Sequence, residues 1–501
     1  MVSPGRAKMR QLPPPHILVV PAVINLSLWA ITANRVSLAE GLAAYLLLLF
    51  AWGSYWHWQR TRSAGMPVLA LAALNYWIYF ALELFLGSRS APDWRHPGRQ
   101  LGDAAITETM MLVLFGIGFL WLGMRSKLSR AMTPKRIPDI PRNRSAVMYV
   151  QAVAAVGSLL TRYGDLPAAL GAGMQVMRIF EATVTLAAIA ILFRWVLDGK
   201  ADAGEKIILF GIVALRAFLG IATGWLGAGL IPALIGVLVY VQKRHKLPIV
   251  ALSYALVFVM FFQAGKNAFR GAFWYGNNGE AGPIEKAEFW VDASLKQWER
   301  AFNDPTGAAL RNLLTFELSR TSLLNQAANV LEQTPAIVPY QYGRLYSYIV
   351  VSLIPRFLWH DKPSMNEANQ FYQVAYGVTS ERDLNAVSIS VGMLTEGYIN
   401  FGWSGTAMVM FFMGVVLGFW NKIFLGGRSI LLMGIGIVLL NVILAVEFDL
   451  AQALSGIIQH VLLSIVVFIP VIRWRSAAIP SAATDSESIT FNHDFSASVQ
   501  R

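Results

Sequence analysis

The chain has 501 residues, of which 55% are hydrophobic and only 14% are charged. A soluble protein carries about 25% charged residues, so the composition excludes an ordinary soluble domain and favours a polytopic membrane protein. The net charge is +12 and there are no cysteines, which excludes disulfides, catalytic thiolates and cysteine-ligated metals. The positive charge lies mainly in loops between apolar stretches, as the positive-inside rule describes, and does not indicate nucleic-acid binding.

Apolar stretches predict an all-α membrane protein with about twelve transmembrane helices. Nine of these fall in an N-terminal membrane bundle at residues 1–264, and the expected spans are 17–33, 40–56, 66–86, 104–124, 146–161, 175–196, 207–222, 226–241 and 247–264. A C-terminal membrane segment at residues 402–472 holds three more, at 402–424, 429–446 and 456–472. Several are shorter than the roughly 20 residues that a bilayer requires, so tilt or flanking residues complete them.

Lysine and arginine set the predicted orientation. The loop 125–144 holds seven basic residues and one acid, and further basic residues lie in 242–247, near the N-terminus and directly after the last span. All of these fall on one side, which is then cytoplasmic together with both termini. The tail 473–501 is rich in serine and alanine and is predicted to be disordered.

Residues 265–401 are then the long extracytoplasmic loop, and helical periodicity predicts that much of it is helical. Val291, Leu295, Trp298 and Phe302 form one helical face, which we expect on the bilayer surface or on other spans. The apolar stretch 345–358 is interpreted as re-entrant or interfacial. The alternative is a complete span paired with another within 385–401, which gives fourteen spans.

Ionisable residues near or inside the membrane are the candidate functional residues, because the bilayer disfavours them unless they bind a substrate, an ion or each other. Arg216 lies in the middle of a predicted span. Its guanidinium either anchors a diphosphate or pairs with Glu83 or Glu181. Arg270 continues the helical face of Lys266 at the outer end of the ninth span, where it either binds an anionic group or anchors the helix at the interface.

The segment 354–363 and the run that ends at Phe401 hold further candidates. Arg356 and Lys362 flank Trp359 and Asp361, between two prolines that restrict the backbone. Glu396 stands alone in a long uncharged run, which is typical either of a general base or of a partner for an arginine.

No pattern predicts a resident metal or cofactor. The seven histidines show no paired ligand spacing, and neither a phosphate-binding GxxxxGK[ST] loop nor a dinucleotide fingerprint is present. We therefore expect a metal-free protein without a nucleotide site.

Several strings in the outer segment occur in a characteristic order: TP at 334–335, VPY at 338–340, GRLY at 343–346, IPRFLWHDKP at 354–363 and EGYINFG at 396–402. Together with the many spans, they resemble the extracytoplasmic signature of Wzy-type O-antigen and exopolysaccharide polymerases. The chain departs from that pattern at His360, where the family has proline.

The resemblance implies a C-type glycosyltransferase-like helical bundle in the bacterial inner membrane. A sugar hydroxyl of one lipid-linked unit attacks the anomeric carbon of a polyprenyl-diphosphate-linked oligosaccharide, and polyprenyl diphosphate leaves. The implied site residues are cations for the diphosphate, an acid as base, and aromatic rings that stack on sugars. They are Arg216, Arg356, Lys362, Arg270 and Arg320 for the diphosphate, Glu396 and Asp361 as catalytic acids, and Trp359, Tyr376 and Tyr398 as sugar contacts.

Two alternatives stay open at this point. One is a glycan ligase that moves finished polymer to another acceptor, and the other is a flippase or transporter of the lipid-linked oligosaccharide. Arg320 also has a simpler interpretation as the partner of Glu317 in a surface ion pair. The expected partners are lipid-linked oligosaccharides and membrane lipids, with a chain-length regulator and a flippase as candidate protein partners and no nucleic acid.

Overall fold

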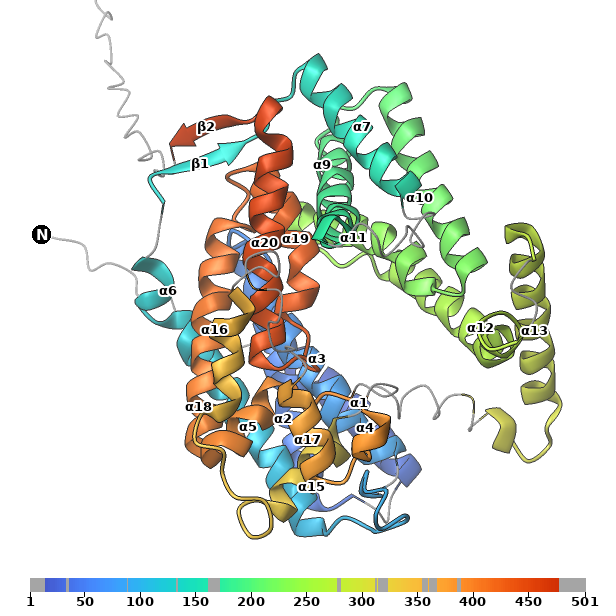
Figure 1. The fold of residues 1–501 in the computed structure, drawn as a ribbon, viewed down its shortest axis with the longest axis vertical. Coiled ribbons are helices and arrows are strands. Elements are labelled where there is room, and N and C mark those ends of the chain that lie inside the picture. Colours follow the sequence, from blue (N-terminus) through green and yellow to red (C-terminus); the bar gives the residue numbers. More distant parts are fainter. Residues whose placement is uncertain are drawn as a thin grey trace, which may run out of the picture.

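A computed structural model describes residues 14–32, 36–87, 89–131, 134–160, 172–276, 281–310, 313, 323–353, 359, 367–384 and 389–476. Helices dominate these residues, and the strands among them are β1 (Arg136–Asp139) and β2 (Arg473–Ser476), which pair antiparallel. Figure 1 shows the arrangement. The all-α class predicted from the apolar stretches is confirmed.

A helix overlaps each of the twelve predicted spans. The N-terminal set is α1 (His16–Thr32), α2 (Leu38–Thr61), α3 to α4 (Val68–Leu86, with a π-helical turn at Trp77–Ala81), α5 (Asp103–Arg125), α7 (Arg144–Leu160), α8 (Ala172–Ile179) running through a second π-helical turn into α9 (Thr185–Leu197), α10 (Ala203–Thr223), α11 (Leu226–Arg244) and α12 (Ile249–Phe273). The C-terminal set is α18 (Gly392–Ile423), α19 (Ile430–Ile443) and α20 (Leu450–Phe468). Among the described residues, eight helices are long and apolar enough to cross a membrane, whereas the exact number of spans stays a prediction.

Further helices connect or cover this bundle. The inner loop after α5 carries α6 (Leu128–Ala131), and the long segment after α12 carries α13 (Pro283–Asn303), α15 (Leu324–Gln333), α16 (Ser347–Leu353) and α17 (Glu367–Ala375). In Figure 1, α15 and α17 lie at the end of the molecule opposite the β1–β2 ribbon.

The central contact of the bundle joins α5 to α18, and glycines bring the two backbones close together. A Cβ on Gly414 would lie 2.1 Å from the Leu120 carbonyl oxygen, and one on Gly123 would lie 2.0 Å from that of Phe411. Helices inside a membrane gain little from apolar burial and associate through such close packing of small residues.

The chain reverses its direction inside α18. Phe401 and Gly402 have non-helical backbone angles, with a φ of +62° at Gly402. In a straight helix, residues 394 and 406 would be about 18 Å apart. Instead, the Thr406 hydroxyl donates a hydrogen bond to the Leu394 carbonyl oxygen at 3.0 Å. α18 is therefore two antiparallel helices joined at residues 401–402.

The first of these two helices, residues 392–400, is called here the re-entrant half-helix. A Cβ on Gly405 would lie 2.0 Å from the Gly397 carbonyl oxygen, so glycines again permit the contact between the two parts of α18. Nine residues of helix measure about 14 Å, less than half of the roughly 30 Å hydrocarbon core. This half-helix is too short to form an additional span.

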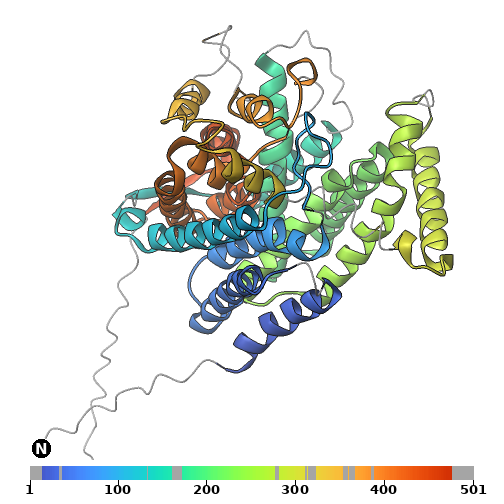
Figure 2. The same cartoon turned by 90° about the horizontal axis from the view of Figure 1, so that it is seen from below.

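Helices α12 and α13 form an arm at the edge of the molecule, as Figures 1 and 2 show. The two helices pack through Phe262, Phe269 and Trp290, and the Trp290 indole donates to the Phe262 carbonyl oxygen at 2.8 Å. The residues of the predicted apolar face of α13 differ in their burial. Trp298 is half-buried against α12 and donates to the Phe261 carbonyl oxygen, whereas the remaining members, Val291, Leu295 and Phe302, are exposed.

Candidate functional site

Glu396 lies on the re-entrant half-helix and is only 1% exposed. Its Oε2 accepts a hydrogen bond from the backbone N–H of Leu450 at 2.8 Å, at the first residue of α20. Its Oε1 is buried and has no hydrogen-bond partner among the described residues. A helix N-terminus favours a carboxylate, so the start of α20 explains how this acid is held at its position.

A second carboxylate occupies the same helix start. Asp449 caps α20 by accepting the backbone N–H of Gln452 on Oδ1 at 2.7 Å, while its buried Oδ2 lacks a partner among the described residues. Burial raises the pKa of Asp449 to about 6, although the N–H groups of Gln452 and Ala451 partly oppose this. The site therefore holds two acids, each with one oxygen that no described residue contacts by a hydrogen bond.

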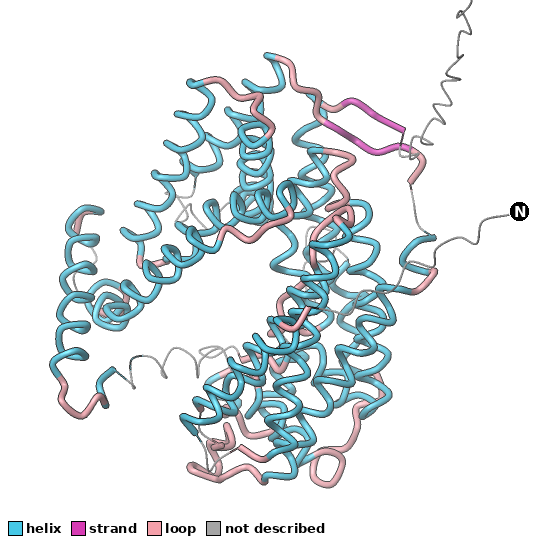
Figure 3. The backbone as a smooth tube through the Cα atoms, turned by 180° about the vertical axis from the view of Figure 1, so that it is seen from behind, coloured by secondary structure: helices cyan, strands magenta, loops and turns pink. Residues whose placement is uncertain are grey.

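Two further helices begin beside these acids. A Cβ on Gly392, at the start of the re-entrant half-helix, would lie 2.3 Å from the Val446 carbonyl oxygen and 3.3 Å from the side chain of Leu323. Leu323 directly precedes α15, and Val446 lies in the link between α19 and α20. The N-termini of α15, α18 and α20 thus lie close together, in a molecule whose backbone is largely helical (Figure 3).

The outer turn of α18 is bound to the segment 340–343. The backbone N–H groups of Gln341 and Tyr342 donate to the carbonyl oxygens of Ile399 and Asn400, and Gly343 N–H donates to the Asn400 side chain at 3.0 Å. Tyr342 is 75% exposed on this turn. The string GRLY therefore contacts the string EGYINFG directly, and both are among the strings that carry the resemblance described above.

Tyr346, at the end of that GRLY string, faces Asn400 and the charge of Glu396. Burial raises the pKa of Tyr346 well above its usual value, and the charge of Glu396 adds to this effect. Its hydroxyl is buried without a hydrogen-bond partner of good geometry among the described residues. Sequence reasoning missed Tyr346, Asn400 and Asp449, because only the fold brings them to Glu396.

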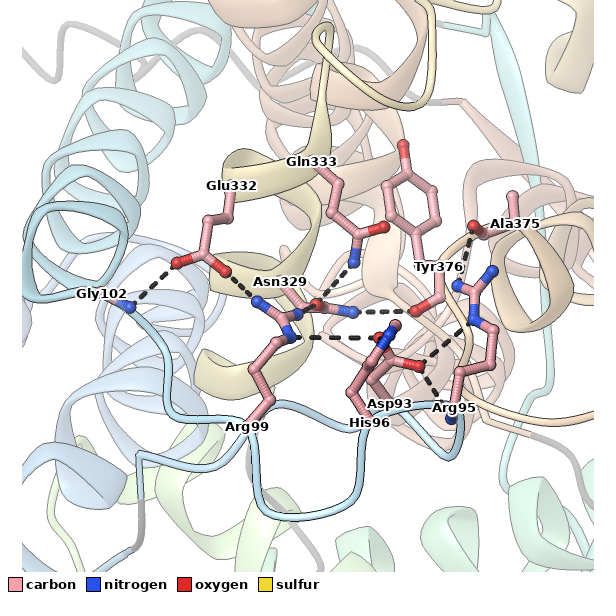
Figure 4. Close-up of polar contacts among 10 residues, drawn as sticks. All are labelled: Asp93, Arg95, His96, Arg99, Gly102, Asn329, Glu332, Gln333, Ala375 and Tyr376. Carbon is pink, nitrogen blue, oxygen red and sulfur yellow. Dashed lines mark hydrogen bonds and ion pairs between the residues drawn. The ribbon is translucent and has the colours of Figure 1, made fainter.

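A network of polar side chains, called here the outer polar cluster, attaches the long outer segment to the membrane bundle (Figure 4). Arg99, in the loop between α4 and α5, donates to both Asn329 and Glu332 on α15. Asn329 in turn donates a hydrogen bond to the carbonyl oxygen of Tyr376 at 3.1 Å, and Tyr376 directly follows α17. Glu332 also accepts the backbone N–H of Gly102 at 2.9 Å.

Asp93, in the loop between α4 and α5, also belongs to the outer polar cluster. It accepts hydrogen bonds from the backbone and the side chain of Arg95 and pairs with His96 at 3.1 Å. Burial would raise the pKa of Asp93, but the hydrogen bonds from His96 and Arg95 outweigh it and hold the pKa below its usual value. Gly377 leaves room for the contact, because a Cβ there would lie 2.3 Å from both Asp93 and Arg95.

Arg216 is 4% exposed in α10 and donates to Glu181 Oε1 at 2.7 Å. This is one of the two ion pairs that the sequence offered as the alternative to diphosphate binding. Two of its nitrogens, Nε and Nη1, are buried and have no hydrogen-bond partner among the described residues. The ion pair with Glu181 therefore involves only part of the Arg216 guanidinium. The binding of a diphosphate by Arg216 stays a prediction.

Arg270 lies on α12, in the arm. Its guanidinium carbon is 4.3 Å from the centre of the Trp274 ring, a cation–π contact. Arg216 and Arg270 thus belong to α10 and α12, whereas Glu396 lies on α18 in the central bundle (Figure 1). Arg216 and Arg270 are therefore not gathered around Glu396.

Of the predicted sugar contacts, Trp359 is 39% exposed. Tyr376 is fully buried, and its hydroxyl shares a 2.6 Å hydrogen bond with Thr334 in the outer polar cluster. Tyr398 is 5% exposed beside Tyr340. In this conformation, Tyr342 and Trp359 present more ring surface to a sugar than the two buried tyrosines do.

The remaining predicted site residues, Arg320, Arg356, Asp361 and Lys362, lie outside the described residues. Their roles stay predictions. Within the described part of the chain, there is no cluster of three or more histidine or acidic side chains that could hold a metal ion.

Residues 111–469, more than half of the chain, match the family model described as a domain of unknown function, DUF8712. The chain belongs to this family. The matched region begins in α5 and ends just after α20, so it includes the long outer segment and the helix starts around Glu396. No curated protein and no solved structure matches the chain.

Proposed function

We propose that the protein transfers a glycan from a polyprenyl-diphosphate carrier to the sugar hydroxyl of a second lipid-linked unit, on the outer face of the bacterial inner membrane. The observation that carries this proposal is Glu396, a buried carboxylate with a free oxygen on a re-entrant half-helix. Ionisable groups at such positions are functional by default. The recognised strings at 343–346 and 396–402 lie against each other at this point.

In the proposed reaction, the acceptor oxygen forms a bond to the anomeric carbon while the bond from that carbon to the diphosphate oxygen breaks. The proton of the hydroxyl passes to a carboxylate, and polyprenyl diphosphate leaves with the bonding electron pair. Glu396 is the proposed base, with Asp361 as the alternative. Because Glu396 is 1% exposed, the reaction requires a movement of the outer segment that admits the acceptor.

The leaving diphosphate requires fixed positive charge. Arg356 and Lys362 are the proposed ligands in the outer segment, and Arg216, Arg270 and Arg320 are weaker candidates. Arg216 supports this role through its two buried nitrogens that have no partner in the described part of the chain, since a guanidinium binds phosphate oxygens through several N–H groups at once.

The test mixes purified protein with polyprenyl-diphosphate-linked oligosaccharide and separates the products by size. We expect a ladder of longer glycans without added nucleotide, and its loss in Glu396→Gln. Glutamine keeps a carbonyl oxygen for the Leu450 N–H but cannot accept the proton. The matched control is Glu299→Gln on the exposed surface of α13, which should leave the ladder unchanged. Wild-type ladders from both Glu396→Gln and Arg356→Ala would refute the proposed site.

One observation favours the second candidate, a transporter of the lipid-linked oligosaccharide. Interrupted helices, together with helix N-termini that point at a binding site, are typical of secondary transporters. Here α18 is interrupted at residues 401–402, and the N-terminus of α20 donates the Leu450 N–H to Glu396 of α18. A transporter would move labelled substrate across a vesicle membrane and leave its covalent structure unchanged, so the size of the product separates the two functions.

A further inference from the structure

A cavity of about 270 Å³ lies beside the β1–β2 ribbon, at the end of the molecule opposite the outer polar cluster. Four separate parts of the chain form it: the segment after β1, the end of α9, the start of α19, and β2. Five basic residues line it: Arg142, Arg194, Lys200, Arg428 and Arg475. Among the lining residues that the structure describes, the acidic ones are Asp139 and Asp198.

Both of those carboxylates already bind groups of the protein. Asp139 accepts the backbone N–H of Ile430 at 2.7 Å and pairs with Arg475 at 3.0 Å. Asp198 pairs with Arg194 at 3.2 Å and with Lys243. With Glu205, which pairs with Arg142, three acids are shared among the five lining cations and Lys243, so the formal charge around the cavity stays positive.

Arg142 is held in place through one of its two terminal nitrogens. Its Nη2 donates to the Lys200 carbonyl oxygen and to Glu205 at 2.8 Å, and its carbon lies 5.3 Å from the centre of the Trp195 ring. Its Nη1 is buried and has no hydrogen-bond partner among the described residues. A fixed guanidinium among further cations is suited to a phosphate oxygen.

We propose that this cavity, called here the basic pocket, binds a phosphate-bearing anion. Its volume lies just below the roughly 300–1,000 Å³ of pockets for drug-sized ligands, which fits a phosphate or a lipid headgroup and not an oligosaccharide. Basic pockets between membrane helices bind the headgroups of anionic lipids, and free phosphate or pyrophosphate offers the same oxygens. The site is separate from Glu396 and does not depend on the proposed glycosyl transfer.

The test has a soluble arm and a lipid arm. In neutral detergent, pyrophosphate is titrated and the shift of the unfolding temperature gives an apparent Kd. In nanodiscs, the unfolding temperature is compared between phosphatidylcholine alone and phosphatidylcholine with phosphatidylglycerol. Stabilisation in both arms, with pyrophosphate ineffective once the anionic lipid is present, assigns the pocket to a headgroup. Stabilisation by pyrophosphate alone assigns it to a soluble anion.

The variant Lys200→Gln with Arg428→Gln removes two cations from the pocket and should weaken binding by about tenfold or more, the loss expected for charge-assisted contacts. The matched control, Arg244→Gln with Lys246→Gln, removes the same charge from exposed positions outside the pocket and should change the Kd by less than about twofold. The proposal is wrong if neither arm shows stabilisation, if the pocket variant binds like wild type, or if the control loses as much.

Discussion

At the scale of single residues, the chain places charges in its interior and holds several of them through specific partners. Arg216 and Glu181 show how strongly the fold depends on such a pair. The Glu181→Gln variant leaves a buried guanidinium without a counter-ion, which costs about 3–5 kcal/mol of stability. A double variant, Arg216→Met with Glu181→Met, should recover most of this loss. Denaturant unfolding in detergent measures both, and a single variant as stable as the double one would contradict the account.

Asp449 makes a prediction about pH. Because burial raises its pKa from 3.8 to about 6, ionisation disfavours the folded state, and this residue's contribution to stability falls as the pH rises from about 4 to about 6. An asparagine side chain at this position would keep the cap but carry no charge. Asp449→Asn should therefore unfold at a higher temperature than wild type above pH 7, by the equivalent of roughly 2–3 kcal/mol, and at an equal temperature near pH 4. If plots of unfolding temperature against pH run parallel for the two proteins, the pKa of Asp449 is not raised.

At the scale of elements, the contact between α5 and α18 depends on the absence of side chains. Gly414→Leu would drive its side chain into the backbone of α5 around Leu120, and we expect a loss of several kcal/mol or failure to fold. Gly118→Leu is the matched control, since nothing lies within 4 Å of a Cβ at that position of α5. Thermal unfolding with a folding readout compares them, and similar stabilities would exclude the close contact.

The outer polar cluster joins three elements through Arg99. Arg99→Gln removes its ion pair with Glu332, and we expect faster hydrogen exchange in 89–102, 324–333 and 375–379, with the spanning helices unaffected. Arg300→Gln on the exposed face of α13 serves as the control and should change none of these segments. Unchanged exchange in Arg99→Gln would show that other contacts hold the outer segment in place.

The sequence predicted the helical elements much better than their contacts. Apolar stretches locate spans because each one must bury its own backbone hydrogen bonds in the membrane, and every predicted span overlaps a helix. The reversal at Gly402 coincides with the predicted start of a span at that residue, but no local pattern predicted that residues 392–400 form a short helix packed against that span. The environment of Glu396 and the outer polar cluster depend on residues far apart in the chain, such as Leu450 and Arg99, which no local pattern connects.

At the scale of the whole molecule, contacts between connecting segments fall into two sets that follow the predicted alternation of sides. Segments expected inside contact each other, as in the pairing of 136–139 with 473–476 and of Arg142 with Glu205. Segments expected outside do the same, as in the contacts of Arg89 with Glu40 and of Arg99 with Glu332. This separation agrees with the predicted alternation of the connecting segments, and which of the two sets faces the cytoplasm stays a prediction.

The proposed reaction releases one polyprenyl diphosphate for each glycosidic bond that forms. Mass spectrometry of the lipid fraction, after incubation of purified protein with the lipid-linked oligosaccharide, measures this ratio directly. We predict one equivalent of polyprenyl diphosphate for each joined glycan unit, and neither product with Glu396→Gln. Intact carrier lipid with unextended glycan, from protein that is folded and still binds the substrate, would contradict glycosyl transfer as the function of this membrane protein.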